Sequence, residues 1–389
     1  MTDRKKPICD VPAGRGRGSE AETVLTQPLA AGTPPLRYRA TELIDFAAAL
    51  FRAAGCEHDK AAAMAEHLVE ADLMGHSTHG LAQAGAYLEE LESGAMRRSG
   101  EPEVVADRPA AVTWDGGYLP GIWLTDKALD LASERASRLG LAAVVIRRAH
   151  HIGCLSVYLR RATERNLMAV VACSDPSDAT MAPFGGLTPV FTPDPIAIGI
   201  PTEGDPILVD ISASITTNAM TGRLRREGRR FPGPWALDAE GRPSDDPAVL
   251  AATPPGTLLP TGGHDHGHKG YGLALAVEAL TQGLSGHGRA ERPTTWGANV
   301  HVQVIDPAAF GGVEAYLRET SWLAKLCRET PPVPGVAAVR LPGQQACARR
   351  HAGLADGVAL YPGIMDSLAS WAEKLKVTLP PAVAPGLRA

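Results

Sequence analysis

The feature that most constrains the fold is an alternation of short apolar runs with longer helical segments between about residues 106 and 344. Helical periodicity occupies the stretches between the short runs and after them. This alternation predicts an α/β or mixed α+β core. The strand-like runs are Ala110–Trp114, Leu141–Ile146, Leu167–Cys173, Pro206–Ile211, His301–Ile305 and Val336–Leu341. The helical stretches are Trp123–Leu139, Leu155–Arg165, Gly270–Leu284 and Ala315–Arg328.

The segment before this core is predicted to be helical. Amphipathic stretches follow one another at about 41–55, 59–75 and 78–94, and each ends at a glycine. Asp59 and Thr78 are suited to cap the second and third helices. We therefore expect a helical subdomain over residues 37–105. A last helix is expected at Ile364–Leu375.

Two stretches lack a hydrophobic period. Residues 1–36 are rich in Gly, Pro, Arg and Thr and are expected to form a flexible tail. They contain Gly14-Arg15-Gly16-Arg17-Gly18, but no strand precedes it and no helix follows, so a linker is favoured over a dinucleotide fingerprint. The polar stretch Arg223–Pro255 is expected to be loop, within a helical and loop insertion at about 220–290.

Composition narrows the classes of function. The 389-residue chain is 44% hydrophobic with a net charge of −5, which excludes a disordered protein and argues against a nucleic-acid binder. No apolar run approaches the roughly 18 residues of a membrane-spanning helix, and no secretory signal is visible. Six cysteines without a C-x-x-C pair are typical of reduced thiols. These features predict a cytoplasmic protein without a membrane partner.

The first histidine cluster is His76-Ser77-Thr78-His79, where the third helix is expected to begin. With Thr78 as the cap, His79 occupies the first helical turn, and the positive end of the helix dipole disfavours its charged form. Gln83 follows four residues later on the same face. Spacing alone favours a packed or surface histidine over a catalytic one.

Two adjacent histidines, His150 and His151, come shortly after the Leu141–Ile146 run. Polar groups at the end of a buried strand are where α/β proteins place ligands and catalytic side chains. Adjacent side chains point in different directions, so at most one of the two faces a given pocket. A catalytic role and a role in starting the next helix are equally open.

The third cluster, His264-Asp265-His266-Gly267-His268, precedes Lys269 and the Gly270–Leu284 helix. Alternating histidines are typical of metal sites. No other ligand cluster supports a metal, so a polar loop is the favoured interpretation and no metal site is predicted. Lys269, at the entrance of the helix, can meet an anionic cofactor, because helix N-termini attract phosphate.

In their order and spacing, several short blocks resemble the type-2 malate/L-lactate dehydrogenase family. That family includes ureidoglycolate, sulfolactate, diketogulonate and Δ1-piperideine-2-carboxylate oxidoreductases. The resemblance covers about residues 40–380. Each block is weak alone, and their combination is specific. The blocks are Ala71-Asp72-Leu73 with Gly75 and His79-Gly80, His151 with Gly153, Met181–Gly186, Val209-Asp210, Trp235–Asp238, Lys269–Leu273 and Leu341–Gln344.

The resemblance implies a fold that composition does not indicate. Family members are not Rossmann proteins, in agreement with the absence of G-x-G-x-x-G from a strand–helix context here. They bind an extended NAD(P) on a mixed, largely antiparallel sheet flanked by helical subdomains. Residues 106–344 would form that sheet domain. Residues 345–389 would join the helical subdomain of 37–105, which serves the substrate and the contact of a homodimer.

The chemistry implied by the resemblance is hydride transfer between NADH or NADPH and a small 2-oxo acid, 2-hydroxy acid or cyclic imine. His151 matches the histidine that is the general acid in reduction and the base in oxidation. His79 matches a second active-site histidine, and Thr78 replaces a serine. The cofactor contacts map onto Ser174, Asp175, Asp210, Ile211, Ser212, Lys269, Gly343, Gln344 and Gln345.

The sequence departs from the family pattern at the substrate. Gln83 stands where the family has an arginine that binds the substrate carboxylate, and an amide cannot make that bidentate, charge-assisted contact. Arg148 is one candidate to replace it, and Arg97 and Arg98 are others.

Three functions follow from these observations. The first is an oxidoreductase for an atypical carbonyl or imine compound, in a specialised biosynthetic pathway. The second is an ordinary malate- or lactate-type dehydrogenase with a relocated carboxylate contact, and the third is a non-catalytic descendant of the fold. The retained His79, His151, Asp210 and Lys269 favour the first.

Overall fold

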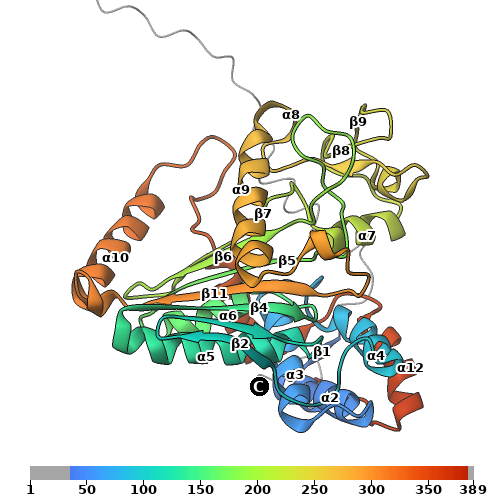
Figure 1. Ribbon diagram of the computed structural model, residues 1–389, viewed down its shortest axis with the longest axis horizontal. Coiled ribbons are helices and arrows are strands. Elements are labelled where there is room, and N and C mark those ends of the chain that lie inside the picture. Colours follow the sequence, from blue (N-terminus) through green and yellow to red (C-terminus); the bar gives the residue numbers. More distant parts are fainter. Residues whose placement is uncertain (1–35, 384–389) are drawn as a thin grey trace, which may run out of the picture.

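The computed structural model describes residues 36–383. The expected tail at 1–36, with its glycine–arginine repeat, lies outside the described residues except for Leu36. Within 36–383 no helix is long and apolar enough to cross a membrane. The described chain contains a large central sheet, a helical subdomain built from both ends of the chain, and a smaller subdomain around a second sheet (Figure 1).

The central sheet has seven strands, and all neighbouring strands but one pair are antiparallel. The exception is the parallel pair β3 and β4, in which Val112 lies opposite Val144. The mixed, largely antiparallel sheet that the resemblance implied is therefore confirmed, and it differs from the mostly parallel Rossmann sheet. The strand order is β2 (Glu103–Arg108), β3 (Ala111–Asp115), β4 (Leu141–Ala149), β11 (Ala298–Ile305), β5 (Met168–Ser174), β6 (Pro195–Ile200) and β7 (Ile207–Ser212).

Helices cover both faces of this sheet (Figure 1). On one face, α5 (Gly121–Leu139) and α6 (Leu155–Thr163) bury apolar side chains against the valines and isoleucines of the central strands. On the other face lies α9 (His268–Glu278), and the π-helical turn Ala279–Gly283 that follows it contacts β5 and β11. The sequence predicted all three helices because their apolar residues recur with a helical period.

The N-terminal helices form a separate core with a helix from the end of the chain. This helical subdomain excludes water from Leu43, Leu68, Leu88 and Leu368, which are almost fully buried. One predicted cap is wrong: α3 begins at His58, before Asp59, and no side chain caps its first turn. The helices are α2 (Ala40–Ala53), α3 (His58–Leu73), α4 (Ala84–Ser93) and α12 (Ile364–Leu375).

A small sheet ties the chain ends together next to the helical subdomain. Its middle strand β1 (Arg37–Tyr38) pairs with β12 (Val358–Ala359) on one side and with β13 (Ala382–Val383) on the other. The helix α11 (Gln344–Asp356), which periodicity did not predict, precedes β12. The predicted strand at Val336–Leu341 is wrong, because this segment pairs with no strand among residues 36–383 and is largely exposed.

The smaller subdomain occupies much of the stretch expected to be loop. Leu224, Phe231 and Leu258 are buried there in a cluster of their own, which explains why the stretch is ordered despite its polar composition. The expectation of loop is therefore wrong for part of Arg223–Pro255. The elements are α7 (Asn218–Arg226), β8 (Ala236–Leu237), β9 (Pro243–Ser244), the 3₁₀ helix Pro247–Ala251 and β10 (Thr257–Leu258).

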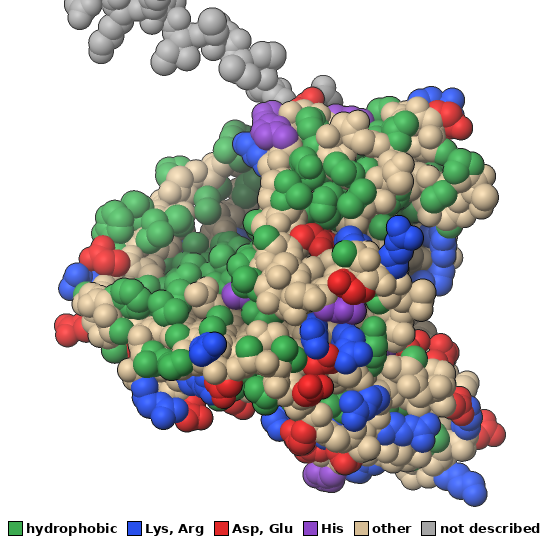
Figure 2. All heavy atoms as spheres, in the orientation of Figure 1, with side chains coloured by type: hydrophobic (Ala, Val, Ile, Leu, Met, Phe, Trp, Pro, Cys, Tyr) green, Lys and Arg blue, Asp and Glu red, His purple; other side chains and the backbone are tan. Residues whose placement is uncertain are grey.

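Helix α10 (Val313–Glu329) projects from the sheet domain (Figure 1). Ala324 is the one residue of this helix that is fully buried, whereas Trp322, Leu323 and Leu326 are 60%, 52% and 48% exposed. Figure 2 shows hydrophobic side chains gathered over α10 and beside the hollow between α10 and α9. An apolar face of this size on a projecting helix is typical of a protein contact.

Candidate active site

Three predicted site segments meet at one edge of the central sheet because of its strand order. β11 lies between β4 and β5, and β6 lies between β5 and β7. Each of these intervening strands is antiparallel to both of its neighbours, so β4, β5 and β7 run parallel to one another. Their carboxyl ends therefore share an edge. His150 and His151 follow β4, Ser174 ends β5, and Ser212 ends β7.

Tyr87, Trp296 and His79 surround His151. The phenol oxygen of Tyr87, from α4, lies 2.6 Å from Nδ1 of His151. The imidazole stacks on Trp296 with 5.1 Å between ring centroids, and it faces the ring of His79 at 6.0 Å. Nε2 of His151 has no hydrogen-bond partner among residues 36–383. This nitrogen is therefore the one that can exchange a proton with a ligand.

Burial keeps the imidazoles of this cluster neutral. It lowers the pKa of His151 well below its ordinary value, and the nearby His79, His150 and His67 act in the same direction. It also lowers the pKa of His79 to about 4.

The hydroxyl of Tyr87 can either accept from Nδ1–H of His151 or donate to an unprotonated Nδ1. The opposite nitrogen of His151 is accordingly an acceptor in one tautomer and a donor in the other.

Tyr87 and Trp296 were not predicted from the sequence to lie at this site. Tyr87 follows His79 and Gln83 at intervals of four residues, and that spacing could have indicated a shared face. Trp296 lies in an irregular segment just before β11, where no local pattern marks it. Only the folded chain brings this indole against the ring of His151.

The turn that carries His79 differs from the prediction. Thr78 caps no helix, because the chain is irregular until the 3₁₀ turn Leu81–Gln83 and α4 begins only at Ala84. The carboxylate of Asp72, from α3, accepts instead from the backbone N–H of Leu81 at 2.8 Å. Oγ1 of Thr78 lies 2.9 Å from Nδ1 of His79 and so orients that ring. Burial, rather than a helix dipole, lowers the pKa of His79.

The two residues predicted to bind the substrate are both engaged by protein groups. Gln83 donates from its side-chain amide to the carbonyl of Thr78 at 2.7 Å. Arg148 donates to both carboxylate oxygens of Asp115, at 2.8 Å from Nε and 2.6 Å from a terminal nitrogen. Asp115 is buried and also accepts from Arg147. Their roles in substrate binding stay predictions, but neither offers a free cation.

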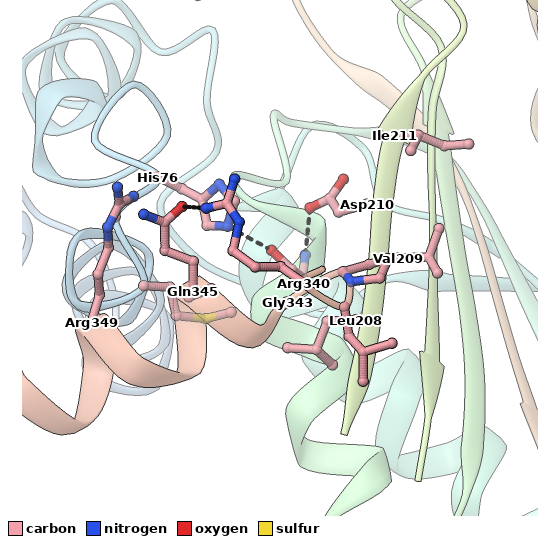
Figure 3. Close-up of a pocket in the computed structure, with 15 residues that line it drawn as sticks. His76, Leu208, Val209, Asp210, Ile211, Arg340, Gly343, Gln345 and Arg349 are labelled. Carbon is pink, nitrogen blue, oxygen red and sulfur yellow. Dashed lines mark hydrogen bonds between the residues drawn. The ribbon is translucent and has the colours of Figure 1, made fainter. Parts of the chain in front are cut away.

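A cavity of about 460 Å³ lies beside this site, between β7, the start of α6 and the start of α11. It brings together the predicted cofactor residues Asp210, Ile211, Gly343 and Gln345. Figure 3 shows Asp210 on β7 pointing toward Gln345, Arg340 and Arg349 on the opposite side, whereas the side chain of the next residue, Ile211, points away from them. The lining residues are Met74, Gly75, His76, Ser156, Leu208, Val209, Asp210, Ile211, Arg340, Leu341, Pro342, Gly343, Gln345, Ala346 and Arg349.

The groups around the cavity suit a phosphate-bearing dinucleotide. Arg340 and Arg349 supply positive charge for a pyrophosphate. Gly343 has a φ of +82°, and a Cβ there would lie 2.6 Å from Cβ of Leu208, so a side chain would disturb the wall. Asp210 accepts the backbone N–H of Ser156 at 3.0 Å, at the first turn of α6. The cavity volume lies within the usual range of about 300–1,000 Å³ for ligand sites.

The other predicted cofactor residues lie outside this cavity. Lys269 is exposed in the first turn of α9. The start of α9 lies close to the end of β7, because a Cβ on the next residue, Gly270, would lie 2.5 Å from the carbonyl oxygen of Ala213. Buried Ser174 is hydrogen-bonded to Thr281 and Gln282. The remaining three bond to nearby groups: Asp175 accepts from Ser177, Ser212 donates to the carbonyl of Ser214, and Gln344 accepts from the N–H of Leu341.

The third histidine cluster is helical rather than a loop. His264 and His266 belong to the short helix α8 (Gly263–His266), and His268 begins α9. In the part of the chain that the structure describes, no group of three or more His, Cys, Asp or Glu side chains is arranged to hold a metal ion.

Comparison with known proteins identifies the fold and the family. Residues 38–369 match the family model described as malate/L-lactate dehydrogenase. The chain belongs to this family. The resemblance inferred from the short sequence blocks is thus confirmed. The matched region, residues 38–369, includes the central sheet, the cavity and most of the helical subdomain.

Two curated relatives of this malate/L-lactate dehydrogenase family member and one solved structure show the extent of the similarity. The L-lactate dehydrogenase of Cupriavidus necator is 30% identical over 82% of the chain and 92% of the relative. The NADP⁺-dependent (2R)-3-sulfolactate dehydrogenase of Chromohalobacter salexigens is 32% identical over 84% and 95%. The solved Δ1-piperideine-2-carboxylate reductase of Pseudomonas syringae superposes with a TM-score of 0.75 at 27% identity, over 86% of the chain and 99% of the reductase.

Proposed function

We propose that this chain is an NAD(P)H-dependent oxidoreductase that transfers a hydride to or from a small carbonyl, 2-hydroxy acid or cyclic imine compound. The observation that carries the proposal is His151, whose Nδ1 is fixed by Tyr87 while its Nε2 has no hydrogen-bond partner among residues 36–383. Family membership supports it, because the matching relatives include dehydrogenases of hydroxy acids and a reductase of a cyclic imine. Bound nicotinamide supplies or accepts the hydride.

In this proposal the protein moves the proton and orients the reactants. In oxidation, Nε2 of His151 removes the hydroxyl proton, and in reduction it returns a proton to the oxygen or nitrogen. The hydrogen bond between Tyr87 and Nδ1 and the stack on Trp296 hold the imidazole in one orientation. His79, oriented by Thr78, forms the opposite wall. Burial of these rings keeps bulk water away from the transferred proton.

The cofactor is proposed to lie along the shared carboxyl edge of β5 and β7. Asp210, Ile211, Gly343 and Gln345 would contact it from the walls of the cavity. Ser174, Asp175, Ser212, Lys269 and Gln344 are proposed to contact parts of the dinucleotide beyond the cavity. The cations Arg340 and Arg349 would face its phosphates. Either NADH or NADPH fits this assignment.

A substrate panel tests the proposal. L-lactate, malate, (2R)-3-sulfolactate and ureidoglycolate are offered with NAD⁺ and with NADP⁺, and Δ1-piperideine-2-carboxylate with each reduced dinucleotide. We expect turnover of at least one compound, followed by dinucleotide absorbance. Turnover of the imine supports the atypical substrate, in line with a specialised biosynthetic role, whereas rapid turnover of malate or lactate supports the ordinary dehydrogenase. Turnover of no compound contradicts this substrate range.

We further propose that the chain acts as a cytoplasmic homodimer, with α10 in the subunit contact in addition to the helical subdomain to which the resemblance assigns that contact. Trp322, Leu323 and Leu326 expose their apolar side chains on one helix that projects from the sheet domain. A second copy that packs against this face would remove it from water, and burial of each large side chain stabilises by about 1.5–3 kcal/mol.

Replacement of Trp322 and Leu326 together by glutamate is expected to separate the subunits. Two carboxylates buried at a contact lose their hydration without gaining partners. Light scattering should give twice 40.8 kDa for the wild type and 40.8 kDa for the double variant. Leu354→Glu, on an exposed site of α11, is the matched control and should remain a dimer. A wild type of 40.8 kDa, or a double variant that stays dimeric, would contradict the proposed contact.

A further inference from the structure

Arg223 is a buried arginine in the wall behind His79. It lies on α7 and is 6% exposed. Its two terminal nitrogens donate to Oγ and to the carbonyl oxygen of Ser77, each at 3.0 Å. Its guanidinium carbon lies 3.8 Å from the centroid of the Tyr361 ring. A guanidinium has five N–H donors, so most of them have no partner among residues 36–383.

No carboxylate of the described part of the chain is in contact with this buried cation. Among the described residues, no Asp or Glu oxygen forms an ion pair with Arg223, although Glu227 and Asp72 act on it through space. Glu227 is committed elsewhere, to Arg229 and to the hydroxyl of Tyr361. Burial raises the pKa of Asp72 to about 7, so this carboxyl is a weak counter-charge at neutral pH. A buried charge without a counter-ion is costly, which indicates that an anion completes the site.

The position of Arg223 places its charge beside the turn that carries His79. Ser77 is two residues from His79 in the same turn, and the charge of Arg223 helps to lower the pKa of His79. The other candidate cations are held away: Arg97 lies beside Gly117, and Arg98 donates to the carbonyl of Leu91. Arg148 shares the carboxylate of Asp115 with Arg147, and its hydrogen bonds hold its guanidinium at that carboxylate.

We propose that Arg223 is the residue of this chain that binds the carboxylate of the substrate. The inference rests on the proposed function and adds a substrate-binding residue to it. The unpartnered N–H groups of Arg223 would meet the carboxylate, and Ser77 and the stacked ring of Tyr361 would hold the guanidinium in place. Gln83 cannot serve in this way, because it is uncharged and its amide is bound to the carbonyl of Thr78.

A purely structural role for Arg223 makes a different prediction. Arg223 connects α7 of the smaller subdomain to Ser77 and Tyr361 of the helical part of the molecule. If it served only as this connection, its loss would lower thermal stability without changing the preference for an anion. The test therefore compares two ligands that differ only in charge: oxamate, which carries a carboxylate, and oxamide, its uncharged diamide.

Both ligands are titrated calorimetrically into the full chain, with and without saturating reduced dinucleotide. The variants are Arg223→Met, Arg223→Lys and the control Arg226→Met, which removes an exposed cation from the same helix. We expect the wild type and Arg226→Met to bind oxamate more tightly than oxamide. Arg223→Met should weaken oxamate by about 30-fold or more, the effect of losing one partner of a buried charged contact. Arg223→Lys should fall in between, because it keeps the charge but not the planar fork.

Two results would overturn the assignment of Arg223: oxamate affinity in Arg223→Met equal to that of the wild type, or a wild type that does not distinguish oxamate from oxamide. Circular dichroism of each variant shows whether it is folded, and Arg223→Lys carries the comparison if the methionine variant is not. Failure of the proposed function has a separate signature. In that case neither NADH nor NADPH binds the wild type. The effect of Arg223 on oxamate binding is measured without the dinucleotide, so it is read independently of dinucleotide binding.

Discussion

Replacing His151 with alanine is expected to lower kcat by about 10²–10⁴-fold, the usual contribution of a positioned proton donor or acceptor. The reason is geometric. Tyr87 and Trp296 fix the imidazole so that Nε2 is left for the substrate, and no other described side chain occupies that position. The loss should appear in kcat with each accepted substrate, measured by steady-state kinetics in both directions.

Two variants control for effects on folding in this experiment. His151→Gln keeps a polar group next to Tyr87 but cannot shuttle a proton, so it should be folded and almost as slow as the alanine variant. His268→Ala removes an exposed histidine at the start of α9 and should keep wild-type kcat. If His151→Ala retained more than about a tenth of the activity, proton transfer by this residue would be wrong.

The pH profile of the wild type follows from the same burial. The pKa of His151 is lowered, so its neutral form persists as the pH falls through the ordinary histidine value of about 6.5. The neutral form is the base in oxidation. The value of kcat/KM for oxidation should therefore stay level through that pH and decline only at lower pH. A decline centred at or above the ordinary value would show that the imidazole is not desolvated in the free enzyme.

Gly121→Ala is expected to destabilise the protein by about 3 kcal/mol or more and to reduce activity with it. A Cβ at Gly121, the first residue of α5, would lie 1.9 Å from the carbonyl oxygen of His150 and 2.8 Å from that of His151. These are backbone atoms that cannot rotate away, so the effect should reach or exceed the upper end of the usual 1–3 kcal/mol for overpacking. The clash would push the backbone of His150 and His151 away from α5, and a displacement of a catalytic group by about 1 Å can cost about 10²-fold in rate.

The matched control is Gly272→Ala. Gly272 lies inside α9 and has an ordinary helical backbone. A Cβ added at Gly272 would have no atom outside its own stretch of helix within 4 Å among the described residues. Alanine there should stabilise by about 0.5–1 kcal/mol through the helix preference of alanine over glycine. Urea denaturation of both variants checks the pair. Equal stability of Gly121→Ala and the wild type would mean that α5 and the His150–His151 segment are not packed as closely as described.

Most of the central sheet was predictable because its strands are short apolar runs. Leu141–Ile146 and Leu167–Cys173 were recognised from composition and correspond to β4 and β5. β2 was missed because all six of its residues are exposed, so no burial pattern marks it. The helix α11 was missed because Cys347 is the one fully buried residue in it, which leaves little apolar periodicity to detect.

The site was predictable where chemistry and local pattern coincide. Histidines after β4 and an aspartate in β7 are visible in the sequence as polar residues at strand ends, and the resemblance assigned them roles. The surroundings were not predictable, since the contacts of His151 with Tyr87 and Trp296 join segments 64 and 145 residues away (151 − 87 and 296 − 151). Long-range contacts of this kind depend on strand order, which periodicity does not determine.

Equilibrium binding of NADH and NADPH to the full chain tests the central claim most directly, because every proposed role depends on a bound dinucleotide. Thermal or chemical denaturation is measured with each dinucleotide separately. At about 100 times its dissociation constant, a ligand that binds the folded chain adds about 2.7 kcal/mol of stability. We predict this stabilisation with at least one of the two. If neither NADH nor NADPH stabilises the protein at millimolar concentration, the proposed oxidoreductase function is contradicted.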